Sequence, residues 1–381
     1  MSSLARGQHA LWNSSRRVQF HQSLPLKPYA KLFSTSATRA AKPVPSNQPS
    51  QTTVSTPEAH EINAPLSTLP ANIDIPAPLD PAAPASYKIK RTIAVGRAYL
   101  TFYKTGLKNV FRNYRASLPL RATLGLPAYL PVSPPRKISS PTEPSNNAPQ
   151  APGKQAIGLG RGQFQLVRRA ARDVRRMIPF TMILIVCGEF TPLIVPIFGA
   201  AITPATCRVP SQITKERDVA SRRKYAALLA HASAAPSPST EPASGSLPRP
   251  AAIGSDHELS LLAEFADPTW AVTADSAAVL RASAVFGLVK RHDRAAGSAL
   301  AGLVYRPRLR RWVEYLAIDD NMIRNGGGVR ALSAAEVRIA CDERGACDVA
   351  TFSKTREAAE QTERKWLERW LKLREGKTKS Q

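Results

Sequence analysis

An apolar segment near the middle of the chain constrains its folding more than any other feature. Thirty-one residues, 177–207, lie between Arg176 and Arg208, and Glu189 is the only charged residue among them. A helix needs about 20 apolar residues to cross roughly 30 Å of hydrocarbon. Basic residues bound the segment on both sides, which is rare for a buried helix of a soluble protein. We therefore predict a transmembrane helix within 177–207.

Two prolines are expected to kink this helix. Pro192 and Pro196 lack amide hydrogens, and the ring of Pro192 would meet the carbonyl of Gly188 one turn earlier. Glu189 lies beside the predicted kink, and an ionisable side chain at membrane depth costs about 2.5 kcal/mol or more. Glu189 is therefore a candidate functional carboxylate. The alternative is a protonated or locally hydrogen-bonded glutamate that caps the freed backbone groups.

The N-terminal region has the composition of a mitochondrial transit peptide, which we predict over residues 1–40. The first acidic residue is Glu58, and many arginines, lysines and serines precede it. An acid-poor, Arg- and Ser-rich start is typical of such peptides, and the alternative is a basic disordered tail. Residues 41–85 are rich in Pro, Ser, Thr and Ala and predict a disordered linker.

A basic amphipathic helix is predicted within residues 86–125, which contain nine basic and no acidic residues. Its composition suits the surface of an inner-membrane bilayer that is rich in anionic, cardiolipin-like lipid. The alternative is a helix that packs on another part of the protein. A Pro-rich linker, 126–155, should follow. The apolar residues at helical spacing are Ile89, Ile93, Leu100, Tyr103, Leu107, Val110 and Tyr114.

The C-terminal third predicts a helical domain, 255–375, which follows the membrane region, 156–224, and a low-complexity insert, 225–254. Ser333 and Glu336 form a capping box, and Gly345 is placed to end that helix. The glycines at 326–328 predict a turn. The whole chain is therefore expected to be all-α, with a disordered N-terminus and linkers. Helices are expected over 258–265, 274–290, 310–324, 334–344 and 357–372.

One dense basic cluster occurs in this domain, at Arg306, Arg308, Arg310 and Arg311. Arginines beside an aromatic residue, here Trp312, suit contact with ribosomal RNA or acidic lipid. The alternative is a solvated helix start. From residue 251 onward the chain has 21 basic and 18 acidic residues, a net charge of +3. A local cluster is therefore the one place where this domain is expected to contact nucleic acid.

The sequence does not indicate a catalytic or metal site. Asp319 and Asp320 are a candidate acid–base pair, but no His, Ser or Cys accompanies them at a recognisable spacing. We expect them to stabilise a helix or an exposed turn beside Arg324. The four cysteines and six histidines lack metal-ligand spacing. No catalytic residue, cofactor, metal site or small-molecule substrate is expected.

Two sets of residues together resemble the LETM family (leucine zipper, EF-hand transmembrane proteins) with its ribosome-binding-like domain. The chain looks like a short, divergent member of the type found in fungi. The calcium loop of the family is not matched, since Ile323 stands where an oxygen ligand is needed. The first set is Gln163 to Arg169, Asp173 to Phe180, Glu189 and Pro192. The second set is Val313 to Asp320, Gly328-Val329, Leu332, Glu336-Val337, Ala340-Cys341, Arg344-Gly345, Trp366-Leu367 and Trp370-Leu371.

The resemblance implies a non-enzymatic protein of the mitochondrial inner membrane. Its C-terminal domain would face the matrix, associate with the mitochondrial ribosome and support membrane-protein biogenesis. The alternative implied by the same family is inner-membrane cation (K+/H+) exchange and mitochondrial volume homeostasis. One span with one carboxylate cannot form an ion pathway alone, so this alternative requires a homo-oligomer.

Overall fold

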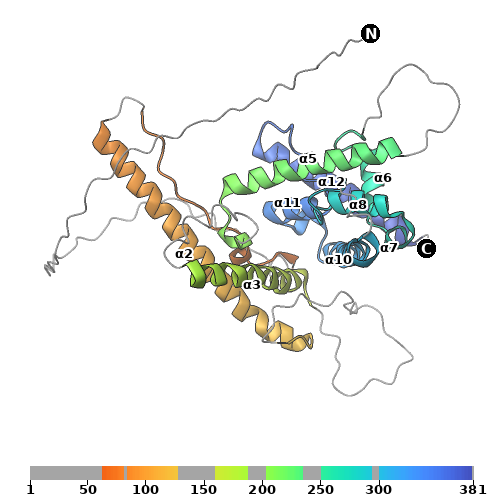
Figure 1. Ribbon diagram of the computed structural model, residues 1–381, viewed down its shortest axis with the longest axis horizontal. Coiled ribbons are helices and arrows are strands. Elements are labelled where there is room, and N and C mark those ends of the chain that lie inside the picture. Colours follow the sequence, from red (N-terminus) through yellow and green to blue (C-terminus); the bar gives the residue numbers. More distant parts are fainter. Residues whose placement is uncertain are drawn as a thin grey trace, which may run out of the picture. The chain divides into compact units, whose positions relative to one another are not determined.

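The computed structural model describes residues 62–80, 84–127, 159–187, 203–234, 250–293 and 300–379 (Figure 1). Within these ranges the regular secondary structure is entirely helical, which confirms the all-α prediction. The predicted transit peptide, 1–40, lies outside the described residues. The same is true of Gly188, Glu189, Pro192 and Pro196, and of residues 128–155 in the predicted Pro-rich linker.

Three long helices precede the C-terminal domain: α2 (Ala85–Thr123), α3 (Arg161–Cys187) and α5 (Pro210–Ala234). α5 takes in residues 225–234, which the sequence assigned to a low-complexity insert. The C-terminal helices are α6 (Asp256–Phe265), α7 (Pro268–Thr273), α8 (Ser276–Val285), α10 (Arg306–Asn325), α11 (Ala334–Glu343) and α12 (Arg356–Lys379). Short helical turns are η1 (Leu66–Thr68), η4 (Ala205–Cys207), η5 (Ala301–Tyr305) and η6 (Val329–Ala331).

The five helices predicted for the C-terminal domain are present as α6, α8, α10, α11 and α12. α7 was not predicted, because it has only six residues and too short an apolar pattern. Side-chain caps explain where α7 and α8 begin. Asp267 accepts a hydrogen bond from the Thr269 amide at 2.7 Å to start α7, and Asp275 accepts one from the Ala278 amide at 3.1 Å to start α8.

The end of α11 follows the sequence prediction, and its start follows that prediction in part. Ser333 Oγ accepts a hydrogen bond from the Glu336 amide at 3.4 Å at the start of the helix. At its end Gly345 has a φ of +83°, and the Ala346 amide donates to the Cys341 carbonyl at 2.9 Å. This is a Schellman ending, in which a left-handed residue closes the last turn. The Glu336 side chain is therefore free for other partners, because it does not complete the capping box.

Ile62 and Asn63, predicted to lie in a disordered linker (41–85), instead pack on the C-terminal domain, and η1 packs on α2 and α3. The side chain of Asn63 accepts from the Ser333 amide at 2.8 Å and donates to the Ala331 carbonyl at 2.8 Å. Ile62 is fully buried beside Gly326, where an added Cβ would come within 3.1 Å of the isoleucine side chain. The prediction of disorder is wrong here, because composition does not register that Ile62 and Asn63 are held by residues far along the chain.

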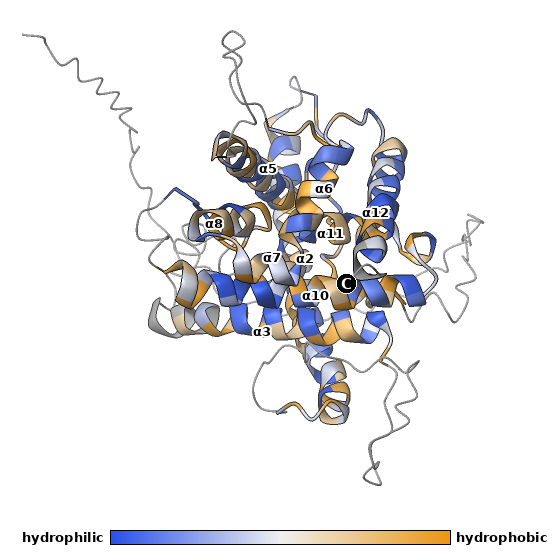
Figure 2. Cartoon of the chain, turned by 90° about the vertical axis from the view of Figure 1, so that its right-hand side faces the viewer, coloured by the Kyte–Doolittle hydropathy of each residue, from blue (hydrophilic) through white to orange (hydrophobic). Residues whose placement is uncertain are grey.

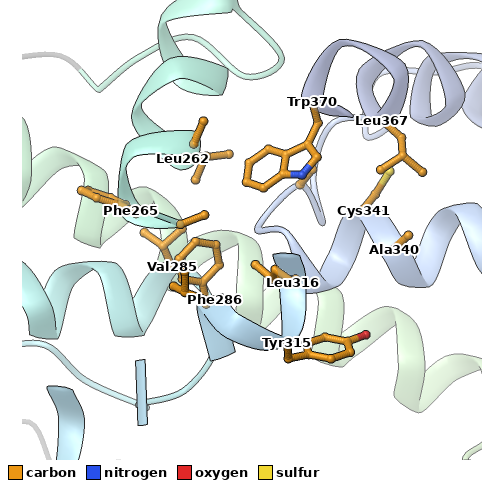
Figure 3. Packing of buried hydrophobic residues seen from close by; sticks show 14 of the residues in the cluster. Leu262, Phe265, Val285, Phe286, Tyr315, Leu316, Ala340, Cys341, Leu367 and Trp370 are labelled. Atoms are coloured by element: carbon orange, nitrogen blue, oxygen red, sulfur yellow. The ribbon is translucent and has the colours of Figure 1, made fainter. Parts of the chain in front are cut away.

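The hydrophobic core gathers side chains from all the C-terminal helices (Figure 3). Trp370 of α12 points toward Leu262 of α6, and Leu367 lies beside Cys341 of α11. The rings of Trp366 and Trp370 stack with centroids 5.5 Å apart. The core also contains Phe164 of α3, so its hydrophobic surface continues beyond the C-terminal helices. Figure 2 shows hydrophobic and hydrophilic residues on opposite faces of several helices, as such packing requires.

The predicted single membrane crossing is not supported by the helices that the structure describes. None of them is both long enough and apolar enough to span a bilayer. α3 contains the first part of the predicted span, up to Cys187, and η4 contains its last three residues. Residues 188–202 of the span lie outside the described part of the chain.

Candidate functional site

A buried cluster of charged side chains joins α3 to the C-terminal helices. It combines arginines of α3, carboxylates of α10 and α11, and one arginine at the end of α11. We call it the charge cluster, and its members are Arg161, Arg169, Asp319, Asp320, Glu336 and Arg344.

Asp319 lies at the centre of the charge cluster. Its Oδ1 accepts hydrogen bonds from Arg161 Nε and from Gln165 Nε2, both at 2.8 Å, and its Oδ2 accepts one from Arg344 Nη2 at 2.9 Å. Burial alone would raise the pKa of Asp319, but the guanidiniums of Arg161 and Arg344 hold it well below its ordinary value. Asp319 is therefore ionised and hydrogen-bonded on both oxygens, which makes it unsuited to proton transfer.

Asp320 extends the cluster toward α12. Its Oδ1 accepts from Arg344 Nη2 at 2.6 Å and from Trp370 Nε1 at 3.1 Å. Asp319 and Asp320 lie within α10, which agrees with the helix alternative, but the alternative of an exposed turn is wrong because both are buried and pair with Arg344. Arg324 instead donates to a backbone carbonyl of α12 at 3.3 Å.

Glu336 links α11 to α3 through two arginines. Arg169 binds it with both terminal nitrogens, at 2.6 Å and 2.8 Å, in a fork-to-fork arrangement. Arg161 Nη1 donates to Glu336 Oε2 at 3.0 Å and so connects this carboxylate with Asp319. Because the three side chains are buried, the start of α3 is fixed to the C-terminal helices by paired charges as well as by apolar contacts.

A second group of contacts lies beside the charge cluster. The Arg168 guanidinium stacks 3.6 Å from the ring centre of Tyr315, and its Nη1 donates to Glu343 Oε1 at 2.7 Å. The Tyr315 hydroxyl also hydrogen-bonds the Glu343 carboxylate. Burial would raise the pKa of Glu343, but Arg168, Arg172 and this hydroxyl lower it to about 2.

This lowered pKa predicts acid sensitivity. Because the folded-state pKa of Glu343 lies below its ordinary value of 4.5, its stabilising contribution is complete above pH 4.5 and is lost as the pH falls toward 2. We expect the free energy of unfolding of Glu343→Gln to fall less steeply over that range than that of the wild type. Urea unfolding of both proteins at several pH values between 5 and 2.5 measures the two slopes. Parallel curves would contradict this role of Glu343.

The four arginines predicted to contact RNA divide into two kinds. Arg306 is half-buried and donates to the carbonyls of Ala271 and Ala274 at 3.1 Å and 2.7 Å, so it closes the end of α7. The other three project from the first turns of α10: Arg308 and Arg311 are exposed, and Arg310 makes only a surface pair with Glu314 at 3.1 Å. We call Arg308, Arg310 and Arg311 the basic end of α10. Leu303 beside it is 83% exposed.

The amphipathic helix predicted within 86–125 is α2, and the described part of the chain covers one of its faces. Phe102 and Val110 are buried, and α2 packs on α3, η1 and η4. This agrees with the alternative of a helix packed on the protein. The other face leaves apolar side chains exposed next to exposed basic ones. The exposed apolar residues are Ile89, Ile93, Tyr103, Leu107 and Phe111, and the basic ones include Arg97, Lys104, Lys108 and Arg115.

Sequence reasoning did not assign the arginines of α3 to a site. Arg161, Gln165, Arg168, Arg169 and Arg172 fall on one side of a helix, because they are three or four positions apart along the chain. A polar face of this kind usually indicates that the face is exposed to solvent. The signal that could have identified it is the set of carboxylates on apolar faces of α10 and α11, about 150 positions further on.

The comparison with known protein families concerns the C-terminal domain. Residues 298–381 match the family described as LETM1-like, RBD (ribosome-binding domain). No curated protein and no solved structure matches the chain. The matched range contains α10, α11 and α12, and with them the carboxylates of the charge cluster and the basic end of α10.

Proposed function

Because residues 298–381 match the LETM1-like ribosome-binding domain family, we propose that the chain associates with the mitochondrial ribosome at the inner membrane and supports membrane-protein biogenesis. The observation that carries this proposal is the match of residues 298–381 to the ribosome-binding domain family. The composition of residues 1–40 is consistent with import into mitochondria. The C-terminal domain is then a matrix domain, and no enzymatic step is required of it.

The basic end of α10 is the proposed contact with ribosomal RNA. Among the described residues none of its three arginines pairs with a buried carboxylate, and guanidinium groups pair well with phosphate oxygens. Each phosphate that an arginine neutralises releases counterions, so binding should weaken steeply as salt rises. Arg306 is left out of this contact, because its donors are occupied by carbonyls at the end of α7.

Replacing Arg308, Arg310 and Arg311 with glutamine should weaken ribosome binding. We expect co-sedimentation with the large subunit at low salt to fall and the salt dependence of binding to lose about one unit of slope per contact removed. Detergent-solubilised mitochondria are sedimented through a sucrose cushion at several salt concentrations. The matched control replaces Lys354, Arg356 and Lys365, three exposed basic residues near or on α12, and should bind like the wild type.

Two results would contradict the proposal. Absence of the wild type from the ribosomal fraction at low salt would remove ribosome association and favour the cation-exchange alternative, which requires a homo-oligomer. Equal sedimentation of the triple variant and the wild type would contradict the assignment of the basic end of α10.

The exposed face of α2 is proposed to contact inner-membrane lipid. Ile89 and Phe111 are 62% and 61% exposed, and α2 has no acidic residue to repel anionic headgroups. Apolar side chains beside lysines and arginines are the combination that holds a helix in the plane of an anionic bilayer surface. Flotation with vesicles that contain cardiolipin, compared with neutral vesicles, tests this contact.

A further inference from the structure

The two flanks of the apolar segment are held against each other. Asp173 of α3 is buried, and its Oδ1 accepts a hydrogen bond from the Ala205 amide at 2.8 Å. Arg176 Nη1 donates to the Thr203 carbonyl at 3.5 Å. Residues just before the segment therefore lie next to its last residues, which directly precede the second flank, 208–224.

The end of the apolar segment also packs closely against α2. Thr206 of η4 is buried, and its Oγ1 donates to the Gly106 carbonyl of α2 at 3.3 Å. A Cβ added at Gly106 would lie 2.7 Å from Cys207 Sγ and 2.8 Å from the Thr206 carbonyl oxygen. α2 therefore needs glycine at this position, and η4 is fixed to both α2 and α3.

This proximity conflicts with a single crossing of the membrane. A crossing helix would separate its two flanks by the roughly 30 Å of the hydrocarbon core, whereas Asp173 and Ala205 share a hydrogen bond.

We propose that the two flanks of the apolar segment lie on the same side of the membrane, so that the chain enters and leaves the bilayer through one face. The inference rests on the proposed function for the membrane setting. It replaces the single crossing expected from the sequence, and it places α2, α3 and the C-terminal domain in one compartment.

The flanking charges give independent support. Residues 154–176 have seven basic residues and one acidic residue, and residues 208–224 have six and two. Under a single crossing, one of these basic flanks would face the side that the positive-inside rule disfavours. With both flanks on the matrix side, the two follow the rule together.

The test labels one exposed position on each flank. Gln163→Cys on α3 and Lys215→Cys on α5 are made separately in a chain whose four native cysteines are alanine. Mitoplasts with an intact inner membrane are treated with a membrane-impermeant maleimide before and after detergent. We expect neither position to react in intact mitoplasts and both to react after detergent. Reaction of only one position in intact mitoplasts would overturn the inference.

Other results separate the inference from the proposed function. Labelling of both positions in intact mitoplasts would uphold the common side and contradict only the matrix placement. Release of the wild type by carbonate extraction would contradict membrane residence, and with it the inference. A second test treats mitoplasts that contain the wild-type chain with trypsin, and it needs no cysteine variant. Cleavage within 208–224 together with protection of 161–176, or the reverse, would also overturn the inference.

Discussion

Asp319→Asn is expected to cost about 3–5 kcal/mol of folding free energy, because breaking a buried ion pair leaves the partner charge uncompensated. The carboxylate accepts hydrogen bonds from Arg161, Arg344 and Gln165 and is fully buried. Asparagine has nearly the same shape but no charge, and its NH2 group would face guanidinium donors. The variant should unfold at a lower urea concentration than the wild type, measured by circular dichroism on the purified protein.

The control for this variant is Asp218→Asn on α5, which removes the same charge from an exposed position. Surface substitutions of this kind usually change stability by less than about 0.5 kcal/mol. If Asp319→Asn matched Asp218→Asn in stability, the charge cluster would not hold α3 to the domain as described. The exposed turn expected from the sequence would have predicted that equality.

Lys224→Met should have an effect of similar size on the attachment of α5. The ammonium group contacts Glu258 Oε1 and Asp348 Oδ1, both at 2.6 Å, and all three side chains are buried. Methionine fills similar space but leaves two carboxylates without their cation, at a cost of about 3–5 kcal/mol. Urea unfolding measures the loss.

The matched control for this variant is Lys215→Met, at an exposed position of the same helix. Because only exposed charge is removed there, the control should keep the stability of the wild type. A triple variant, Lys224→Met with Glu258→Gln and Asp348→Asn, should recover part of the loss, because it removes the unpaired charges. No recovery would indicate that packing alone carries the effect of the lysine.

Short-range sequence patterns predicted the C-terminal helices well. The start and end of α11 depend on Ser333 and Gly345, which act within a few residues of their own positions. The ranges expected for α10 and α12, 310–324 and 357–372, also fall within the observed helices. A helix cap depends on residues that are close together in the chain, so it can be predicted from the local sequence.

Long-range pairing could not be predicted in the same way. Arg161 and Asp319 are 158 positions apart, and Lys224 and Asp348 are 124 apart. Nothing in the spacing of either partner indicates which opposite charge it meets or that both are buried. Composition also misplaced Ile62 and Asn63 in a disordered linker, because their anchoring depends on a surface formed by α10 and α11.

Site-specific photo-crosslinking tests the ribosome contact most directly. A photoreactive amino acid replaces Arg311 at the basic end of α10 or, as a control, Glu357 in the exposed first turn of α12. Mitochondria are irradiated at low salt, and crosslinked RNA and proteins are identified. We expect position 311 to recover ribosomal RNA or large-subunit protein, and position 357 to recover much less. Equal recovery from both positions, or none from position 311, would contradict ribosome docking through this surface.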